Sequence, residues 1–320
     1  MRAVLPAAVL LTAPLLAACG SDDPSTSTDA GSAKGNRVGN INIGPEQDRV
    51  RAEKDERIAA LVPKEVREAG VLRTGLSADA APPLGFFATD DKTRIGSEID
   101  LATLVADTLG LELDGQIVSW ENLFVGLDSG KFDAVFSNVT VTEERKDKYD
   151  FATYRLDNLA FEAKKGSGWK VDGPEDVAGK TIAVSSGTNQ EKILVDWSER
   201  NEKAGREPVS IKYFQKDTDY YLALQSGRID GYLGPNPTVA YHVESAGQSE
   251  VIGTLSGAGG DLQGKIAATT KKDSGLVDAY AAALDRVIAD GSYAKVLKRW
   301  GLSGEAIEKS EINPEGLPRP

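Results

Sequence analysis

The stretch WENLFVGLDSGKFDAVFSNVTVTEERKDKYDFATY, residues 120–154, decides the fold that the sequence predicts. Its apolar residues first repeat at helical spacing over 120–128, between Ser119, a typical N-cap, and Gly130, a typical helix stop. Residues 134–136 are wholly apolar, as expected of a short strand buried in a parallel sheet. The stretch therefore predicts a helix, a buried strand and a polar turn, the repeating unit of an α/β fold.

Polar side chains follow this strand at its carboxyl end: Ser137, Asn138, Thr140 and, one turn into a short helix, Arg145. Ligands of open α/β sheets bind beyond the carboxyl ends of strands. A guanidinium matches the two oxygens of a carboxylate and stays charged at any relevant pH, and Trp120 offers an aromatic face beside it. The alternative is that Arg145 pairs with a nearby acid on a solvated helix and that Trp120 fills core.

Composition limits the classes of function. The chain has 320 residues, of which 40% are hydrophobic and 27% charged, as in ordinary globular proteins of about two domains. A formal net charge of −12 argues against a nucleic-acid partner. One cysteine and one histidine, His242, supply no ligand set for zinc, haem or an iron–sulfur cluster. We expect no cofactor, no metal and no catalytic residue.

One motif has to be set aside. Residues 259–265 read GGDLQGK, which fits the first seven positions of a phosphate-binding loop. Ile266 stands where that loop needs a hydroxyl for magnesium, and the segment precedes a predicted strand instead of following one. We therefore do not expect a nucleotide site here.

The first twenty residues, MRAVLPAAVLLTAPLLAACG, indicate a targeting segment. Arg2 precedes an apolar run that is too short to span a membrane. The run ends in Leu-Ala-Ala-Cys, which resembles a bacterial lipobox with Cys19 as the lipidated residue; the alternative is a plain secretory signal with an incidental cysteine. Residues 20–60, rich in small polar and then charged residues, are expected to form a flexible tether with a peripheral surface helix.

Beyond residue 63 strands and helices alternate, which predicts a mixed α/β protein. A second strand–helix series begins at residue 181, and a final strand and two helices over 265–300 return to the first pattern.

Several ordered motifs resemble the family 3 extracellular solute-binding proteins, the polar amino-acid receptors of ABC importers. The motifs are Gly96-x-Glu98-Ile99-Asp100-Leu101, Leu127-x-Ser129-Gly130-Lys131-x-Asp133, Thr140-x-Thr142-x-x-Arg145, Ser186-Gly187-Thr188, Leu224-x-Ser226-Gly227-Arg228-x-Asp230, Asp290-Gly291-x-Tyr293 and Trp300-Gly301. The resemblance implies a periplasmic-binding-protein type II-like fold, two α/β lobes joined by two hinge strands with the ligand cleft between them.

The domain boundaries implied are a signal peptide over 1–19, a tether over 20–60, lobe 1 over 70–157 plus 264–303, lobe 2 over 158–263, and a tail over 304–320.

The same resemblance assigns the binding residues. It implies that Arg145 clamps the ligand carboxylate, with donors from lobe 1 and lobe 2 around the ligand and Trp120 stacked on it. The complete expected set is Ser77, Trp120, Ser137, Asn138, Thr140, Arg145, Thr188, Asn189 and Asn236.

One position departs from the family pattern. An aspartate that binds the α-ammonium group is usual after the strand at 229–233, and here that position holds Pro235, which has neither charge nor N–H. Either another acid, Asp79 or Asp157, supplies the negative charge, or the ligand is not a simple α-amino acid.

The function implied is a monomeric receptor, anchored outside the cytoplasm through Cys19, that closes on a small carboxylated solute and delivers it to an ABC importer permease. Two alternatives remain open: a sensory or interaction module without transport, and a dehydratase-like enzyme on the same fold.

Overall fold

The computed structural model describes residues 36–260 and 262–319, which belong to one compact unit. The predicted signal segment, Cys19 and the part of the predicted tether up to residue 35 lie outside the described residues. No helix in the described part of the chain is long and apolar enough to cross a membrane.

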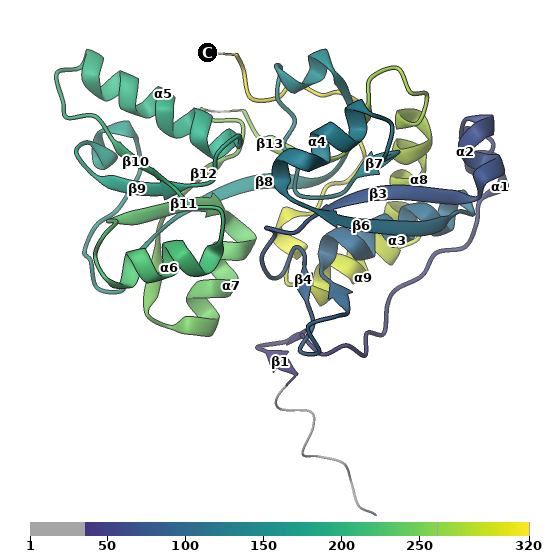
Figure 1. Ribbon diagram of the computed structural model, residues 1–320, viewed down its shortest axis with the longest axis horizontal. Helices are drawn as coiled ribbons and strands as arrows, with labels where there is room; N and C mark the ends of the chain where they lie inside the picture. Colours follow the sequence, from purple (N-terminus) through teal and green to yellow (C-terminus); the bar gives the residue numbers. More distant parts are fainter. Residues whose placement is uncertain (1–35, 261, 320) are drawn as a thin grey trace, which may run out of the picture. The chain divides into compact units, whose positions relative to one another are not determined.

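Strands and helices alternate along the chain (Figure 1). The strands are β1 Arg37–Val38, β2 Ile41–Asn42, β3 Val71–Ser77, β4 Phe86–Phe87, β5 Arg94–Ile95, β6 Glu112–Val118, β7 Ala134–Val135, β8 Tyr149–Lys164, β9 Thr181–Val184, β10 Ser210–Tyr213, β11 Gly231–Pro235, β12 Ser249–Ser256 and β13 Gly264–Lys271. The α-helices are α1 Glu56–Ala59, α2 Lys64–Ala69, α3 Ser97–Leu109, α4 Trp120–Asp128, α5 Asn189–Lys203, α6 Asp217–Gln225, α7 Asn236–Ala246, α8 Val277–Ala289 and α9 Ser292–Arg299, with 3-10 turns at Arg145–Asp147, Pro174–Val177 and Ser303–Glu305.

Strand β8 joins two lobes (Figure 1). Its first half pairs antiparallel with β13 in the first lobe, and its second half pairs with β11 and β12 in the second. The sheet runs in the order β10-β9-β11-β8-β13-β7-β3-β6, with β12 beside β8. The chain returns to the first lobe between β12 and β13. The expected fold, two α/β lobes joined at two crossings, is confirmed.

The first lobe packs α3, α8 and α9 against its sheet. One apolar core unites buried residues from both ends of the chain, among them Leu72, Leu104, Leu284 and Trp300. The second lobe has its own smaller cores, around Phe161 and around the Tyr220–Tyr232 aromatic pair. Because each lobe buries its own apolar surface, contacts between the lobes are left free to be polar.

Helix α4 begins where the sequence predicts, but its N-terminal backbone N–H group is not capped by Ser119 as expected. Ser119 occupies the N-cap without a side-chain bond to the helix, and the carboxylate of Asp79 accepts the Trp120 N–H at 3.0 Å instead. A carboxylate is favoured there because the first N–H groups of a helix lack internal partners. The helix therefore holds Asp79 at the carboxyl end of β3.

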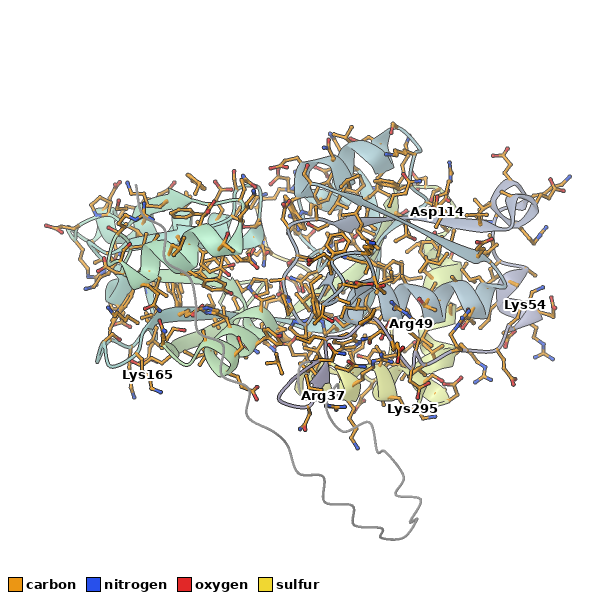
Figure 2. The ribbon with its side chains drawn as sticks, turned by 60° about the horizontal axis from the view of Figure 1, so that its bottom comes forward. Arg37, Arg49, Lys54, Asp114, Lys165 and Lys295 are labelled. Carbon is orange, nitrogen blue, oxygen red and sulfur yellow. The ribbon has the colours of Figure 1, made fainter. Side chains whose placement is uncertain are left out.

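Residues 36–60 lie against the first lobe instead of forming the flexible tether that we predicted there. Arg49, labelled in Figure 2, pairs with the buried Asp100 and also donates to the Arg94 carbonyl at 2.7 Å. Arg51 donates through Nε and Nη2 to the two carboxylate oxygens of Asp107. The expected helix over 46–61 shrinks to α1. The charged residues of this segment pair with acids of α3, and composition alone does not reveal such pairing.

The predicted polar tail is likewise built into the fold. Leu317 exchanges backbone hydrogen bonds with Val141 and Glu143, while its side chain is buried in a second-lobe core that includes Ile193. The C-terminal segment, yellow in Figure 1, thus connects residues 141–143 of the first lobe with the second lobe.

Candidate functional site

A cavity of about 100 Å³, open in part to solvent, lies between the two lobes at the carboxyl ends of β3, β9 and β11. It is lined by Ser77, Asp79, Ala80, Ala81, Leu84, Trp120, Ser137, Asn138, Ser185, Ser186, Thr188, Asn189, Gln190, Gln215, Asp217, Tyr232, Leu233, Pro235 and Thr238. A concave site where apolar and aromatic side chains meet a few polar groups is typical of small-molecule binding.

Six of the nine predicted ligand-binding residues line this cavity: Ser77, Trp120, Ser137, Asn138, Thr188 and Asn189. Three do not: Thr140, Arg145 and Asn236. The structure therefore gathers the predicted hydroxyls, amides and indole, and places the predicted guanidinium just behind them.

Two serines fix the floor of the cleft. The Ser77 N–H donates to Ser137 Oγ at 2.8 Å, and Ser137 in turn donates to the Phe136 carbonyl at 2.7 Å. Ser77 Oγ accepts the Asp79 N–H at 3.1 Å, which leaves its own proton for a ligand. These bonds hold β3, β7 and the Asp79 loop in one arrangement.

Asn138 has a left-handed backbone with φ 54°, a conformation that asparagine tolerates better than most residues. Its N–H donates to the buried Glu98 at 2.9 Å, and its side-chain oxygen accepts from the buried Arg155. That N–H is therefore already used and is not a donor for a ligand in this structure. The side-chain NH₂ is the group that it offers to the cleft.

Arg145 stands at the contact between the lobes. Its guanidinium donates to the Thr140 carbonyl at 2.9 Å and, across the lobes, to the Gly187 carbonyl at 3.2 Å. It also lies 5.5 Å from the ring centre of Trp120 and 5.3 Å from that of Phe124, within cation–π range.

The charge of Arg145 is not neutralised. Asp157 and Glu144 act on the guanidinium only through their charge, and none of the described carboxylates forms an ion pair with it. Burial lowers the pKa of Arg145 to about 10, because the charged form loses hydration. A partly buried cation without an anion favours binding of an anionic group nearby.

Thr140 and Asn189 are tied to a third residue. Both donate to the same carboxylate oxygen of the buried Asp157, Thr140 Oγ1 at 2.7 Å and Asn189 Nδ2 at 3.1 Å. Asn189 also donates to the Gly257 carbonyl at 2.8 Å. Burial raises the pKa of Asp157 to about 6. Asp157 thus connects Thr140 of the first lobe with Asn189 of the second by hydrogen bonds. Asp79 and Asp157 were the two acids considered as substitutes for the missing aspartate, and of these only Asp79 lines the cleft.

Thr188 and Asn236, two second-lobe residues that we predicted to bind the ligand, form hydrogen bonds within the protein. The Thr188 hydroxyl accepts the Glu191 N–H at 3.3 Å, as the N-cap of α5, and donates to the Ser185 carbonyl at 2.7 Å. Asn236 donates to Glu305 at 3.1 Å, outside the cavity, while its neighbour Pro235 lines it.

Asp217 is a lining residue that the sequence analysis did not identify. Lys216 holds the N-cap position of α6, and Asp217 is the first helical residue, at the cleft. Burial, and less strongly the charge of Asp79, raise the pKa of Asp217 to about 6. A signal was present: the acid follows a strand at its carboxyl end, where ligands of α/β sheets bind.

No group of three or more metal-ligating side chains occurs among residues 36–260 and 262–319. His242, a partly buried residue of α7 in the second lobe, lies with its Nδ1 2.5 Å from the Glu162 carboxylate and stacks on Tyr221.

Comparison with known proteins settles the family. Residues 72–303 match the family described as bacterial extracellular solute-binding proteins, family 3. The chain belongs to this family. Family 3 relatives include the arginine-binding protein ArgT of Corynebacterium glutamicum, 29% identical over 262 residues that cover 81% of this chain and 84% of the relative. The L-cystine-binding protein TcyJ of Escherichia coli K12 is 29% identical over 236 residues, 73% of this chain and 84% of the relative.

Solved structures of family 3 type share the fold. An ancestral arginine-binding protein bound to arginine aligns with a TM-score of 0.63 and 29% identity, covering 72% of this chain and 98% of that one. The ancestral amino acid-binding protein AncCDT-1, a precursor of cyclohexadienyl dehydratase, aligns with a TM-score of 0.63 and 27% identity, covering 75% and 99%.

Proposed function

We propose that this solute-binding protein is the extracytoplasmic, lipid-anchored receptor of an ABC importer, and that it closes its lobes on a small amino acid or amino-acid derivative with a free carboxylate. The observation that carries the proposal is the position of Arg145, an unneutralised guanidinium where the two lobes meet behind the cleft. Relatives named for arginine and cystine binding support an amino-acid ligand.

Lobe closure has a physical basis in polar contacts across the cleft. Trp120 Nε1 donates to the Gly187 carbonyl at 3.4 Å, Arg145 donates to the same oxygen, and Lys192 pairs with Glu144. A ligand that touches both lobes adds contacts that exist only in the closed state, so it shifts the population toward that state.

A thermal-shift panel on protein that begins at residue 20 tests this function. L-arginine, L-lysine, L-citrulline, L-cystine, L-glutamine and agmatine form the panel. A ligand at a hundredfold excess over Kd stabilises the folded state by about 2.7 kcal/mol, which raises Tm by several degrees. We expect at least one α-amino acid to do so. A folded protein with no response to any α-amino acid contradicts the proposal and favours a sensory or interaction module.

A second function has one observation in its favour. Asp217, with its raised pKa, stands in the cleft where a dehydratase needs a general acid, and AncCDT-1 links the fold to that chemistry. Turnover of a cyclohexadienyl carboxylic acid, followed by product absorbance, would establish it.

The lipid anchor rests on the sequence around Cys19, and its test is independent of the ligand. Expressed in a bacterium that lipidates such proteins, the chain is expected to sediment with membranes and to incorporate labelled palmitate. Cys19→Ala should lose the label and most of the membrane fraction, because one protein without an acyl chain has little membrane affinity. Equal labelling of both proteins contradicts the anchor.

A further inference from the structure

The charges at the cleft have one sign. Its lining contains two carboxylates, Asp79 from the first lobe and Asp217 from the second, and none of the described lysine, arginine or histidine side chains. The lining also presents two aromatic side chains, Trp120 and Tyr232. Carboxylates and aromatic faces without a cation among them favour a positively charged guest.

The two carboxylates are in different states. Asp79 accepts the Trp120 N–H and so has a partner within the fold. No hydrogen bond contributes to the electrostatics of Asp217; burial and the charges of Asp79 and Glu162 oppose its ionised form, and only His242 favours it. Holding such a carboxylate at the cleft is unfavourable unless a ligand cation compensates it.

A purely structural role for Asp217 is already filled by another residue. Acids in the first turn of a helix stabilise it through the helix dipole, and α6 has two, Asp217 and Asp219. Asp219 is exposed and absent from the cavity lining, so it serves the helix from the solvent side. The helix gains little more from an acid that is desolvated in the cleft.

The positions of Asp79 and Asp217 suit them to different parts of one ligand. Asp79 is bonded to the N–H of Trp120, whose ring lies beside Arg145. If Arg145 takes the α-carboxylate, Asp79 is therefore the acid near the α-carbon. Asp217 lines the same cavity from the opposite lobe, at the start of α6, and is therefore the acid available to the rest of the ligand.

We propose that Asp217 binds a cationic group on the ligand's side chain, so that the receptor selects amino acids carrying a second positive charge, with Asp79 receiving the α-ammonium group in place of Pro235. The inference rests on the proposed function and names the ligand class of that same site. Closure then brings an acid from each lobe onto one dicationic ligand.

L-arginine and L-citrulline test the selection, because they have nearly the same shape and differ in side-chain charge. Calorimetry on the wild-type protein should show a preference for arginine of about 10- to 100-fold, the range expected for a hydrogen bond to a charged group. Asp217→Asn should remove most of that preference by weakening arginine binding, with citrulline binding little changed. Asp219→Asn, which deletes the same charge on the solvent side of α6, should bind both ligands like the wild type.

The pH profile gives a second readout. Below about pH 6 Asp217 takes up a proton, so arginine affinity of the wild type should fall as the pH drops from 7.5 to 5. Other groups face Asp217, namely Asp79 from the loop after β3, Glu162 from β8, His242 from α7, and the hydroxyls of Tyr220, Tyr221 and Tyr232. The other groups affect both ligands, so a pH dependence seen for arginine but not for citrulline, and lost in Asp217→Asn, identifies Asp217 as the group responsible.

Two results overturn the inference while the receptor function stands: equal binding of arginine and citrulline by the wild type, or an unchanged preference in Asp217→Asn. Binding of no amino acid at all overturns the receptor function, and the inference with it.

Discussion

Glu305→Ala is expected to lower the free energy of unfolding by about 3–5 kcal/mol, the usual cost of removing one partner from a buried ion pair. Arg155 is 1% exposed and Glu305 5% exposed, and they pair at the junction of the lobes. Glu98, the other acid near Arg155, is 3.7 Å away. Glu305 also accepts from Asn236 at 3.1 Å, so its loss leaves that amide without this acceptor and leaves Arg155 only the longer contact with Glu98 as an ion pair.

Urea denaturation measures this effect. Glu308→Ala is the matched control, since Glu308 is exposed three residues further on and should change stability by less than about 0.5 kcal/mol. Joint replacement, Arg155→Met with Glu305→Leu, should not recover the loss, because the buried Glu98, which lies 3.7 Å from Arg155, then loses its cation. A single Glu305→Ala variant within about 1 kcal/mol of the wild type would show that Arg155 finds other compensation.

Arg145→Ala is expected to weaken binding of L-arginine by about 30-fold or more, because truncating one side of a desolvated charge pair costs about 2–5 kcal/mol. The guanidinium is held by Thr140 and Gly187 and lacks an anion, so a ligand carboxylate would complete its coordination. Its loss also removes a bond between the lobes. Calorimetry at pH 7.5 gives the affinity.

Agmatine separates the carboxylate from the rest of the ligand. The wild type should prefer L-arginine over agmatine, which lacks the carboxylate, and Arg145→Ala should lose most of that preference. Lys148→Ala removes an exposed cation from the same segment and should leave both affinities unchanged. An undiminished preference in Arg145→Ala would refute the carboxylate clamp.

Elements with strong local signals could be predicted from the sequence. Helix α4 begins and ends where its apolar spacing and Gly130 indicate, and β7 and β9 agree with their apolar runs within a residue. Each of these elements has one face against a core, so the pattern of apolar residues carries the information.

Pairing between distant strands could not be read in the same way. The sequence indicated a strand only over 158–164, whereas β8 begins at Tyr149, because half of its partners lie on β13. Strand β12 was missed altogether; it is an eight-residue, partly exposed strand whose partner is β8. Propensity does not reveal a strand that is defined by a neighbour about a hundred residues away.

The candidate site likewise contains some residues that local sequence patterns indicate and others that only the tertiary fold reveals. Ser137 and Asn138 were found because they follow a strand of the sheet, and Ser77 was found through the family resemblance; the cavity lies at the carboxyl ends of these strands. Asp217 was missed because an acid at a helix start has an ordinary local explanation, and only the tertiary fold shows that it faces the cleft. Likewise the engagement of Thr140 with Asp157 depends on a contact that no local pattern encodes.

The connection of the lobes has a consequence for the order in which they form during synthesis. Most of the second lobe is one continuous segment. The core of the first lobe, in contrast, includes Leu284 from α8 and Trp300 at the end of α9, which pack against residues that precede β8. As the chain emerges from its N-terminus, residues 158–263 have most of their core partners first, and Leu317 joins that core last. The apolar surface of the first lobe remains exposed to solvent until α8 and α9 have been synthesised. We expect the nascent protein to be most prone to aggregation during this interval.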